Sequence, residues 1–334
     1  MTAAPPLLVI AGPTASGKSA AAQALAEHSG AAIVSCDSLA VYRGFDIGTA
    51  KPTAAERARV PHHLVDVVDP EQTFHAADYV ALADAAIAAS QADGRPVIVC
   101  GGTALYLKAL LSGLFAAPPP DPDLRARLKA EAARLGWPAL HARLAACDPA
   151  AAARIAPVDP VRIERALEIF EQTGVPISQL QAAHAARGER RPALVFIVDP
   201  PAAVHDLAIA ARTDRMLAAG LVEETARLAA AHDRGLKPFG ALGYKEALAH
   251  LDGNLDLPAL REAIRVATRR FARRQRTFFR KAWPPAPAAT PDGDGARWVP
   301  SASDLLGGDI RSMIDALLGV RPDRSDKDSA PCPR

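Results

Sequence analysis

Residues 7–19 read LLVIAGPTASGKS, and this stretch decides the fold of the chain. Its first part, Leu7–Ala11, is a short apolar run with the length and branching of a strand buried in a parallel sheet. The next eight residues, GPTASGKS, match the phosphate-binding pattern G-x-x-x-x-G-K-[ST]. Residues 20–28 are mostly good helix formers. The order strand, glycine-rich loop, helix favours a phosphate-binding loop over an ordinary turn.

The physical chemistry of this loop explains its residue types. Glycines permit backbone angles that side chains forbid, so successive N–H groups can turn inward and form a nest for anionic oxygens. The following helix adds its positive end, Lys18 a point charge, and the Ser19 hydroxyl a ligand for Mg²⁺. The pattern, shared with nucleotide-binding and ATP-binding proteins, does not specify which pyrophosphate-like anion binds. The predicted binding residues are Gly12, Pro13, Thr14, Ala15, Ser16, Gly17, Lys18 and Ser19.

Composition narrows the class of protein. The chain has 334 residues and a net charge of only +2, so a nucleic-acid surface requires local clustering of charge. Its four cysteines are scattered without a C-x-x-C pair, which argues against a disulfide framework or a zinc site. The first apolar run is too short for a signal peptide or a membrane span. We expect a cytoplasmic monomer without a membrane partner.

Further strand-like runs alternate with helical stretches, which predicts an α/β fold with a parallel sheet flanked by helices, similar to that of P-loop NTPases. Ligands gather at the carboxyl ends of such strands. Asp37 follows the second predicted strand, and Thr103 follows Gly101-Gly102 at the end of a later one. Thr103 either caps the next helix or acts in the site. The predicted strands after the first are residues 31–35, 60–68, 96–100 and 193–198.

A proline-rich stretch at residues 116–122 indicates a domain boundary. The chain from 123 to 186 has only helical patterns, including a helix that begins after Asp159 and ends at Gly174. We therefore predict a core of residues 1–117 and 191–285 and an all-helical insertion of residues 118–190. Residues 286–334 are predicted to form a partly disordered tail, with a helix near 304–318 and disorder from 321 onward.

Residues 261–281 carry eight arginines and one lysine against a single acid, Glu262. Ile264, Ala267, Phe271 and Phe278 predict the seam of a helix that packs on the core. Solvated helices usually mix charges of both signs, so a cationic helix indicates a polyanion and favours nucleic acid as the partner.

Six stretches occur in an order that resembles the bacterial tRNA dimethylallyltransferases, and the resemblance covers residues 1–283. Among them the segment from 37 to 52 is the most specific, because many other enzymes share the phosphate loop. The stretches are GPTASGKS (12–19), DSLAVYRGFDIGTAKP (37–52), GGTALYLKALLSG (101–113), PVRIERALEIFEQTG (160–174), FGALGYKE (239–246) and RRFARRQRTFFRK (269–281).

The resemblance implies a Mg²⁺-dependent prenyltransferase that modifies tRNA. In that family the dimethylallyl group moves from dimethylallyl diphosphate to N6 of the adenine 3′-adjacent to the anticodon, in tRNAs that read codons beginning with U. The products are N6-isopentenyladenosine and diphosphate. Carried onto this chain, the resemblance makes Asp37 the general base and places Thr103 and Arg125 in the reaction channel.

The partner it implies is the tRNA anticodon stem-loop, bound by the helical insertion and by several core stretches. On the residue pattern alone, Arg162 and Arg165 also fit a solvated helix face. The residues expected at the tRNA are Asp37, Ser38, Leu39, Ala40, Thr103, Arg125, Val161, Arg162, Ile163, Glu164, Arg165, Gly240, Ala241, Leu242, Gly243, Tyr244, Lys245, Arg273, Arg274 and Arg276.

Two other functions use the same loop. A small-molecule or nucleotide kinase also needs a phosphate loop, Mg²⁺ and an aspartate at the next strand end, but it has no use for the cationic helix. A GTPase-like RNA-binding switch would need a guanine-specificity motif such as N-K-x-D, which the sequence lacks.

Overall fold

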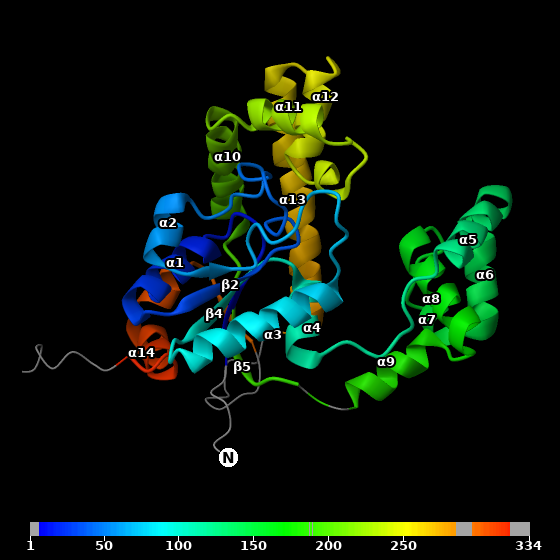
Figure 1. Ribbon diagram of the computed structural model, residues 1–334, viewed down its shortest axis with the longest axis horizontal. Helices are drawn as coiled ribbons and strands as arrows, with labels where there is room; N and C mark the ends of the chain where they lie inside the picture. Colours follow the sequence, from blue (N-terminus) through cyan, green and yellow to red (C-terminus); the bar gives the residue numbers. More distant parts are fainter. Residues whose placement is uncertain (1–6, 187, 189, 285–295, 321–334) are drawn as a thin grey trace, which may run out of the picture. The chain divides into compact units, whose positions relative to one another are not determined.

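The computed structural model describes residues 7–186, 188, 190–284 and 296–320 of the chain. It divides into two compact units (Figure 1). The first, here called the core unit, comprises Met1–Leu111 and Arg191–Arg334, and the second, the helical unit, comprises Ser112–Arg190. No described helix is long and apolar enough to cross a membrane.

The core unit is built on a six-stranded sheet with the strand order β3-β2-β4-β1-β5-β6. Every pairing along this order is parallel, and β1 lies between β4 and β5. The phosphate-loop strand is therefore central, and the α/β fold predicted from the sequence is confirmed. The strands are β1 (Leu7–Ala11), β2 (Ala32–Cys36), β3 (His62–His63), β4 (Val97–Gly101), β5 (Ala193–Val198) and β6 (Arg297–Val299).

Both faces of the sheet are buried, and alternate residues of each strand serve opposite faces. Leu8 and Ile10 of β1 pack with α1 (Lys18–Ser29) and α14 (Gly308–Leu317). Leu7 and Val9 belong to the other apolar cluster, on the opposite face. Helices that contribute to this second cluster are α3 (Ala76–Ala92), α4 (Ala104–Ser112), α10 (Ala202–Ala218), α11 (Leu221–Ala231), α12 (Tyr244–Leu251) and α13 (Leu257–Ala282).

The predicted strand at residues 60–68 is wrong in extent, because only His62–His63 pairs as a strand and Val68 makes an isolated bridge to Tyr42. Leu64 and Asp66 have φ angles of 61° and 58°, a left-handed conformation that strands do not adopt. Helix α2 (Ala54–Arg59), which was not predicted, begins with a capping box. In that box the side chains of Thr53 and Glu56 each accept a hydrogen bond from the other residue's backbone N–H.

Residues 296–320 belong to the core unit, which corrects the predicted tail. Strand β6 pairs with β5, and it is followed by η2 (Ser303–Leu306) and α14. Leu305 and Ile314 are fully buried in the cluster that contains Leu8 and Ile10. The helix predicted near 304–318 is present as α14. The disorder predicted from 321 onward lies outside the described residues.

The helical unit has its own apolar core, in which Leu128, Leu144 and Ile163 are fully buried. As predicted, α8 begins after Asp159, whose side chain accepts from the Arg162 N–H, and ends at Gly174 with a φ of 70°. The described part of the unit is helical throughout: α5 (Pro122–Leu135), α6 (Trp137–Cys147), α7 (Pro149–Ala152), α8 (Pro160–Thr173) and α9 (Ile177–Ala185).

Helix α13 packs on the core unit along a seam that differs from the predicted one. Ile264 is buried as expected, but Ala267 and Phe271 are only half-buried, and Phe278 is 37% exposed. Two members of the true seam, Thr268 and Gln275, are polar, which is why a search for apolar spacing misplaced it. The buried residues are Leu260, Ile264, Thr268, Ala272, Gln275 and Phe279.

Candidate active site

The phosphate loop joins β1 to α1 in the conformation that its glycines predict. Gly12 lies so close to β5 that an added Cβ would come within 2.4 Å of the Val198 carbonyl oxygen. Gly17 has a φ of 86°, in the left-handed region that favours glycine. The Lys18 ammonium group donates to the Pro13 carbonyl across the loop at 3.0 Å. Burial lowers the pKa of Lys18.

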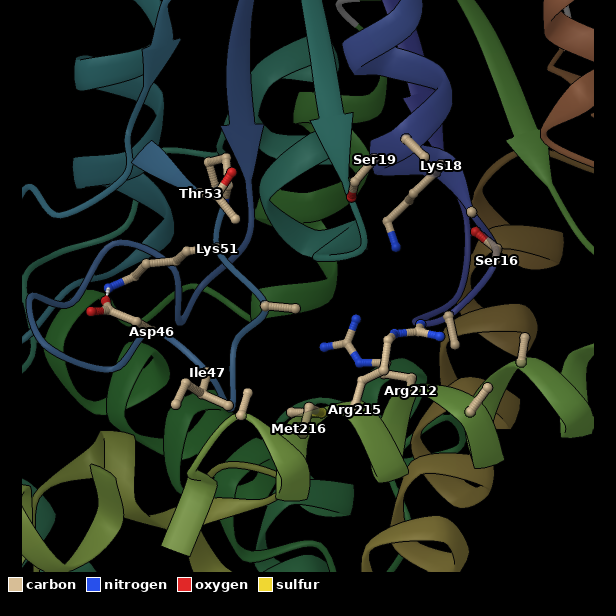
Figure 2. Close-up of a pocket in the computed structure, with 18 of the residues that line it drawn as sticks. Ser16, Lys18, Ser19, Asp46, Ile47, Lys51, Thr53, Arg212, Arg215 and Met216 are labelled. Atoms are coloured by element: carbon tan, nitrogen blue, oxygen red, sulfur yellow. Dashed lines mark hydrogen bonds and ion pairs between the residues drawn. The ribbon is translucent and has the colours of Figure 1, made fainter. Parts of the chain in front are cut away.

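A cavity of about 830 Å³ opens on this loop. Residues of the loop, of the segment 46–54 and of α10 line it. Figure 2 shows Lys18 reaching into the cavity from the loop, with Arg212 and Arg215 reaching in from α10 on the other side. Lys51 and Arg57 also line the cavity but are paired with Asp46 and Asp66. The other three cationic groups suit a ligand with several negative charges. The two arginines were not identified from the sequence, because single arginines on a helix carry no local signature.

A second cavity of about 250 Å³ brings several predicted site residues together. Lys18, Ser19 and Arg212 line both cavities. Asp37 and Thr103 line the second, as expected from their places after β2 and β4. The Arg212 guanidinium lies close enough to be affected by Asp37: burial lowers the pKa of Arg212, and the Asp37 charge opposes that shift.

Asp37 is fixed by an Asx turn. Its Oδ1 accepts from the backbone N–H groups of Leu39 at 2.8 Å and Ala40 at 3.2 Å. Its Oδ2 has no hydrogen bond to any residue that the structure describes. One carboxylate oxygen therefore holds the turn, and the other is available to a substrate.

The Thr103 side chain supports the same turn. Its Oγ1 accepts from the Ser38 N–H at 3.0 Å, while its own N–H donates to the Cys36 carbonyl at 3.1 Å. The first N–H groups of α4 are served by the Thr103 carbonyl, not by its hydroxyl. Thr103 thus ties the end of β4 to the end of β2, next to Asp37.

The segment 37–52 is held in place by a buried polar cluster formed by Tyr244 and Glu224. The Tyr244 hydroxyl donates to Glu224 at 2.5 Å and accepts from the Gly48 N–H at 3.1 Å. Glu224 also accepts from the Ile47 N–H. A Cβ on residue 48 would lie 2.3 Å from the Tyr244 ring, so glycine is required there. The nearly fully buried side chain of Lys51 pairs with Asp46 within the segment and with Asp66 outside it.

This cluster corrects part of the predicted tRNA surface. Tyr244 is fully buried, and Ala241 and Ala40 are 9% and 5% exposed. Their side chains build the core, so they shape the site from within. Gly240 and Lys245 are exposed and Leu242 is half-buried, so these remain candidates for RNA contact.

Arg125 lies in the helical unit, where its guanidinium donates to both oxygens of the fully buried Glu168, at 2.8 and 2.9 Å. Arg165 donates to the same carboxylate at 2.6 Å. Burial alone would raise the pKa of Glu168, but hydrogen bonds from these two arginines and from the Asp121 N–H hold it below its usual value.

The predicted RNA stretch on α8 is also corrected by burial. Ile163 is fully buried and Glu164 is 9% exposed, so neither presents its side chain to a ligand surface. Val161, 75% exposed, and the exposed Arg162 lie on the open face of the helix.

On α13, the exposed Arg273 and Arg274 make no ion pair within the described part of the chain. Arg276 differs, because its guanidinium is largely buried and pairs with Asp199. The prediction that Arg276 contacts RNA is therefore replaced by an internal role. Gln275 and His205, which the sequence analysis did not identify, contact the phosphate loop directly.

Residues 40–282 match the model of a protein family described as IPP transferase. The chain is 55% identical over 275 residues to a tRNA dimethylallyltransferase of Anaeromyxobacter dehalogenans, with 82% of this chain and 92% of that protein covered. It is 49% identical to one of Myxococcus xanthus, covering 86% and 96%. The structure resembles that of a full-length tRNA isopentenylpyrophosphate transferase from Bacillus halodurans, with a TM-score of 0.62, 33% identity and 95% of each chain covered.

Proposed function

This chain belongs to the IPP transferase family, and from that premise and the site geometry we propose how it transfers a prenyl group to tRNA. The donor is dimethylallyl diphosphate. The acceptor is N6 of the adenine that follows the anticodon, in tRNAs that read codons beginning with U. The relatives are named for dimethylallyl transfer to tRNA, and the cationic face of α13 is explained by RNA but not by a kinase.

The observation that carries this proposal is the pair of cavities sharing Lys18, Ser19 and Arg212. The larger one has the cationic groups that a diphosphate needs, and the smaller one contains the Asp37 carboxylate. A site for the diphosphate leaving group thus lies next to a general base, because the two cavities share lining residues.

In the transfer, the C1–O bond of the donor breaks and its electron pair leaves with the diphosphate. The N–H groups of the loop, Lys18, Arg212 and Arg215 face the charge that develops on the leaving oxygens. Each well-placed donor of this kind contributes about 3 kcal/mol to transition-state stabilisation. The dimethylallyl carbon then becomes electrophilic enough for a weak nucleophile.

The exocyclic amine of adenine is such a nucleophile. Its nitrogen forms the new bond to C1 and gives up one proton, which Asp37 accepts at Oδ2. The Asx turn at Oδ1 holds this carboxylate in place while it acts. To reach Asp37, the adenine must leave its stack in the anticodon loop, as bases do in other enzymes that modify them.

The residues present fit a Mg²⁺ ion bound mainly through the diphosphate. The Ser19 hydroxyl lines both cavities, and no group of three or more His, Cys, Asp or Glu side chains among the described residues could hold a metal on its own. This donor set suits Mg²⁺, which retains water and takes few protein ligands beside phosphate oxygens. When bound, the ion would offset diphosphate charge.

For the RNA, we assign contacts to exposed groups in each unit. Arg273 and Arg274 in the core unit and Val161 and Arg162 in the helical unit are the exposed members of the predicted surface. Arg125 uses Nε and Nη2 on Glu168, and its Nη1 makes no hydrogen bond within the described residues, so it can still serve a substrate.

The test is Asp37→Asn, which keeps an oxygen for the Asx turn but removes the base. We expect single-turnover transfer to an anticodon stem-loop to slow by ~10²–10⁴-fold, the usual contribution of general-base catalysis. Asp93→Asn, at the exposed end of α3, is the matched control and should leave the rate unchanged. Transfer by Asp37→Asn within about threefold of the control would remove Asp37 from the mechanism.

A further inference from the structure

Thr14 of the phosphate loop is held at both of its backbone polar groups by helices from the C-terminal half of the chain. The Thr14 N–H donates to Gln275 Oε1 at 2.8 Å, and the Thr14 carbonyl contacts His205 Nε2 at 2.7 Å. The Thr14 N–H is therefore committed within the protein. The Ser16 N–H also donates within the loop, to the Pro13 carbonyl at 3.3 Å, so the predicted anion-binding nest is left with the other N–H groups that follow Thr14.

Gln275 connects the Thr14 N–H to the second glycine turn of the site. Only 8% of it is exposed, and its Nε2 donates to the Gly102 carbonyl at 2.9 Å. A Cβ on residue 102 would lie 2.5 Å from that nitrogen, so the approach depends on glycine. One amide side chain thus joins the loop after β1 to the turn after β4, where Thr103 supports Asp37.

His205 of α10 contacts the Thr14 carbonyl, and its own orientation is fixed by Arg276 of α13. It is 1% exposed, and its Nδ1 lies 2.8 Å from the Arg276 guanidinium, which can only donate. Nδ1 is therefore the acceptor, and Nε2 carries the proton that goes to Thr14. Arg276 is fixed in turn by Asp199 and by the Pro200 carbonyl.

We propose that Gln275 and His205 are positioning residues that set the shape of the diphosphate loop from helix α13. Neither is needed to touch the reacting atoms. They hold the Thr14 backbone so that the remaining N–H groups of the loop converge on the ligand. The residues just before Gln275 are the exposed Arg273 and Arg274, so one helix supports the diphosphate loop and carries the cationic RNA face. The inference rests on the proposed function for the identity of the ligand.

The probe is inorganic pyrophosphate with Mg²⁺, measured by calorimetry on the full chain. Gln275→Leu removes both hydrogen bonds and leaves the half-buried Thr14 N–H and the buried Gly102 carbonyl unpaired, which we expect to weaken pyrophosphate binding about tenfold or more. The KM for the stem-loop should change by less than about twofold, since the exposed arginines remain. A general loss of structure would instead change both the pyrophosphate affinity and the KM for the stem-loop.

Thr225→Val is the matched control for losing a buried polar group. Thr225 is fully buried, and its hydroxyl only bonds the Leu221 carbonyl within α11. It should bind pyrophosphate as the unmodified chain does. If Gln275→Leu also binds like the unmodified chain, or if it changes both quantities equally, the inference is overturned.

Variants of His205 give a second, independent test that can be used if Gln275→Leu does not fold. His205→Gln places an amide N–H near the position of Nε2 and should restore most of the affinity, whereas His205→Leu should lose it. Equal affinities in these two variants would contradict the inference. If the unmodified chain binds pyrophosphate but transfers no prenyl group, the proposed function fails while the positioning role stands.

Discussion

Replacing Tyr244 by phenylalanine tests whether the buried cluster holds the segment 37–52. The hydroxyl is the only part removed, so ring packing against Phe45 is kept. Its loss leaves the buried Gly48 N–H unpaired and takes one donor from Glu224. Leaving a buried polar group unsatisfied costs about 1–3 kcal/mol, so we expect a loss near 2 kcal/mol in the free energy of unfolding.

For a domain of 150–250 residues this corresponds to a fall of about 4–8 °C in Tm, measured by thermal unfolding at neutral pH. Tyr79→Phe is the matched control, since Tyr79 is equally buried but its hydroxyl faces the Cys36 thiol, a weak hydrogen-bonding group. It should cost less than about 1 kcal/mol. If the Tm of Tyr244→Phe equals that of Tyr79→Phe, the cluster does not hold the segment 37–52.

Two further variants test electrostatic features of the units. Glu168→Gln breaks the buried pairing with Arg125 and Arg165 and should cost about 3 kcal/mol of unfolding free energy, measured in denaturant; a loss below about 0.5 kcal/mol would contradict this. Because the folded pKa of Glu168 lies below 4.5, the carboxylate stabilises the fold above that pH, and this stabilisation is lost as the pH falls. The free energy of unfolding of Glu168→Gln should lack this part of the pH dependence. Burial lowers the pKa of His205 below 6.5; the Arg276 charge adds to this shift, and the charges of Asp199 and Asp206 oppose it. Protonation of His205 below pH 6.5 should therefore destabilise the folded state. His205→Gln should flatten the stability profile below pH 6.5, and an unchanged profile would show that His205 does not titrate on unfolding.

The parts of the fold that sequence could predict are those with a local signature. Leu7–Ala11 and the loop after it combine an apolar run with fixed glycine positions, and Ala193–Val198 is an uninterrupted apolar run. Asp159 and Gly174, which cap α8, are likewise adjacent to the helix in the sequence and are residue types typical of helix ends. Each of these elements has the predicted form.

Elements stabilised mainly by tertiary contacts were missed or misplaced. β6 spans only Arg297–Val299, with a polar and an aromatic residue, and it is a strand because β5 pairs with it. The seam of α13 was misplaced because Gln275 and Thr268 occupy buried positions. Polar residues recurring at core spacing on a helix are a signal that could have located Gln275, since a buried amide requires partners.

Site residues divide in the same way. Asp37 and Thr103 could be placed because strand ends in a parallel sheet meet at one edge. Arg212 and His205 lie on α10, far from any motif, and only the folded chain brings them to the loop. The segment 240–245 was assigned to RNA as a unit, whereas the structure buries Tyr244 and leaves Lys245 exposed.

The central claim is that the loop beginning at Gly12 holds an allylic diphosphate while Asp37 prepares an adenine for alkylation. Its most direct test is mass spectrometry of an anticodon stem-loop incubated with the protein, dimethylallyl diphosphate and Mg²⁺. The account predicts one isopentenyl group on the adenosine that follows the anticodon, and none when that adenosine is replaced by guanosine. RNA recovered without the added group, from protein that binds both substrates, would contradict it.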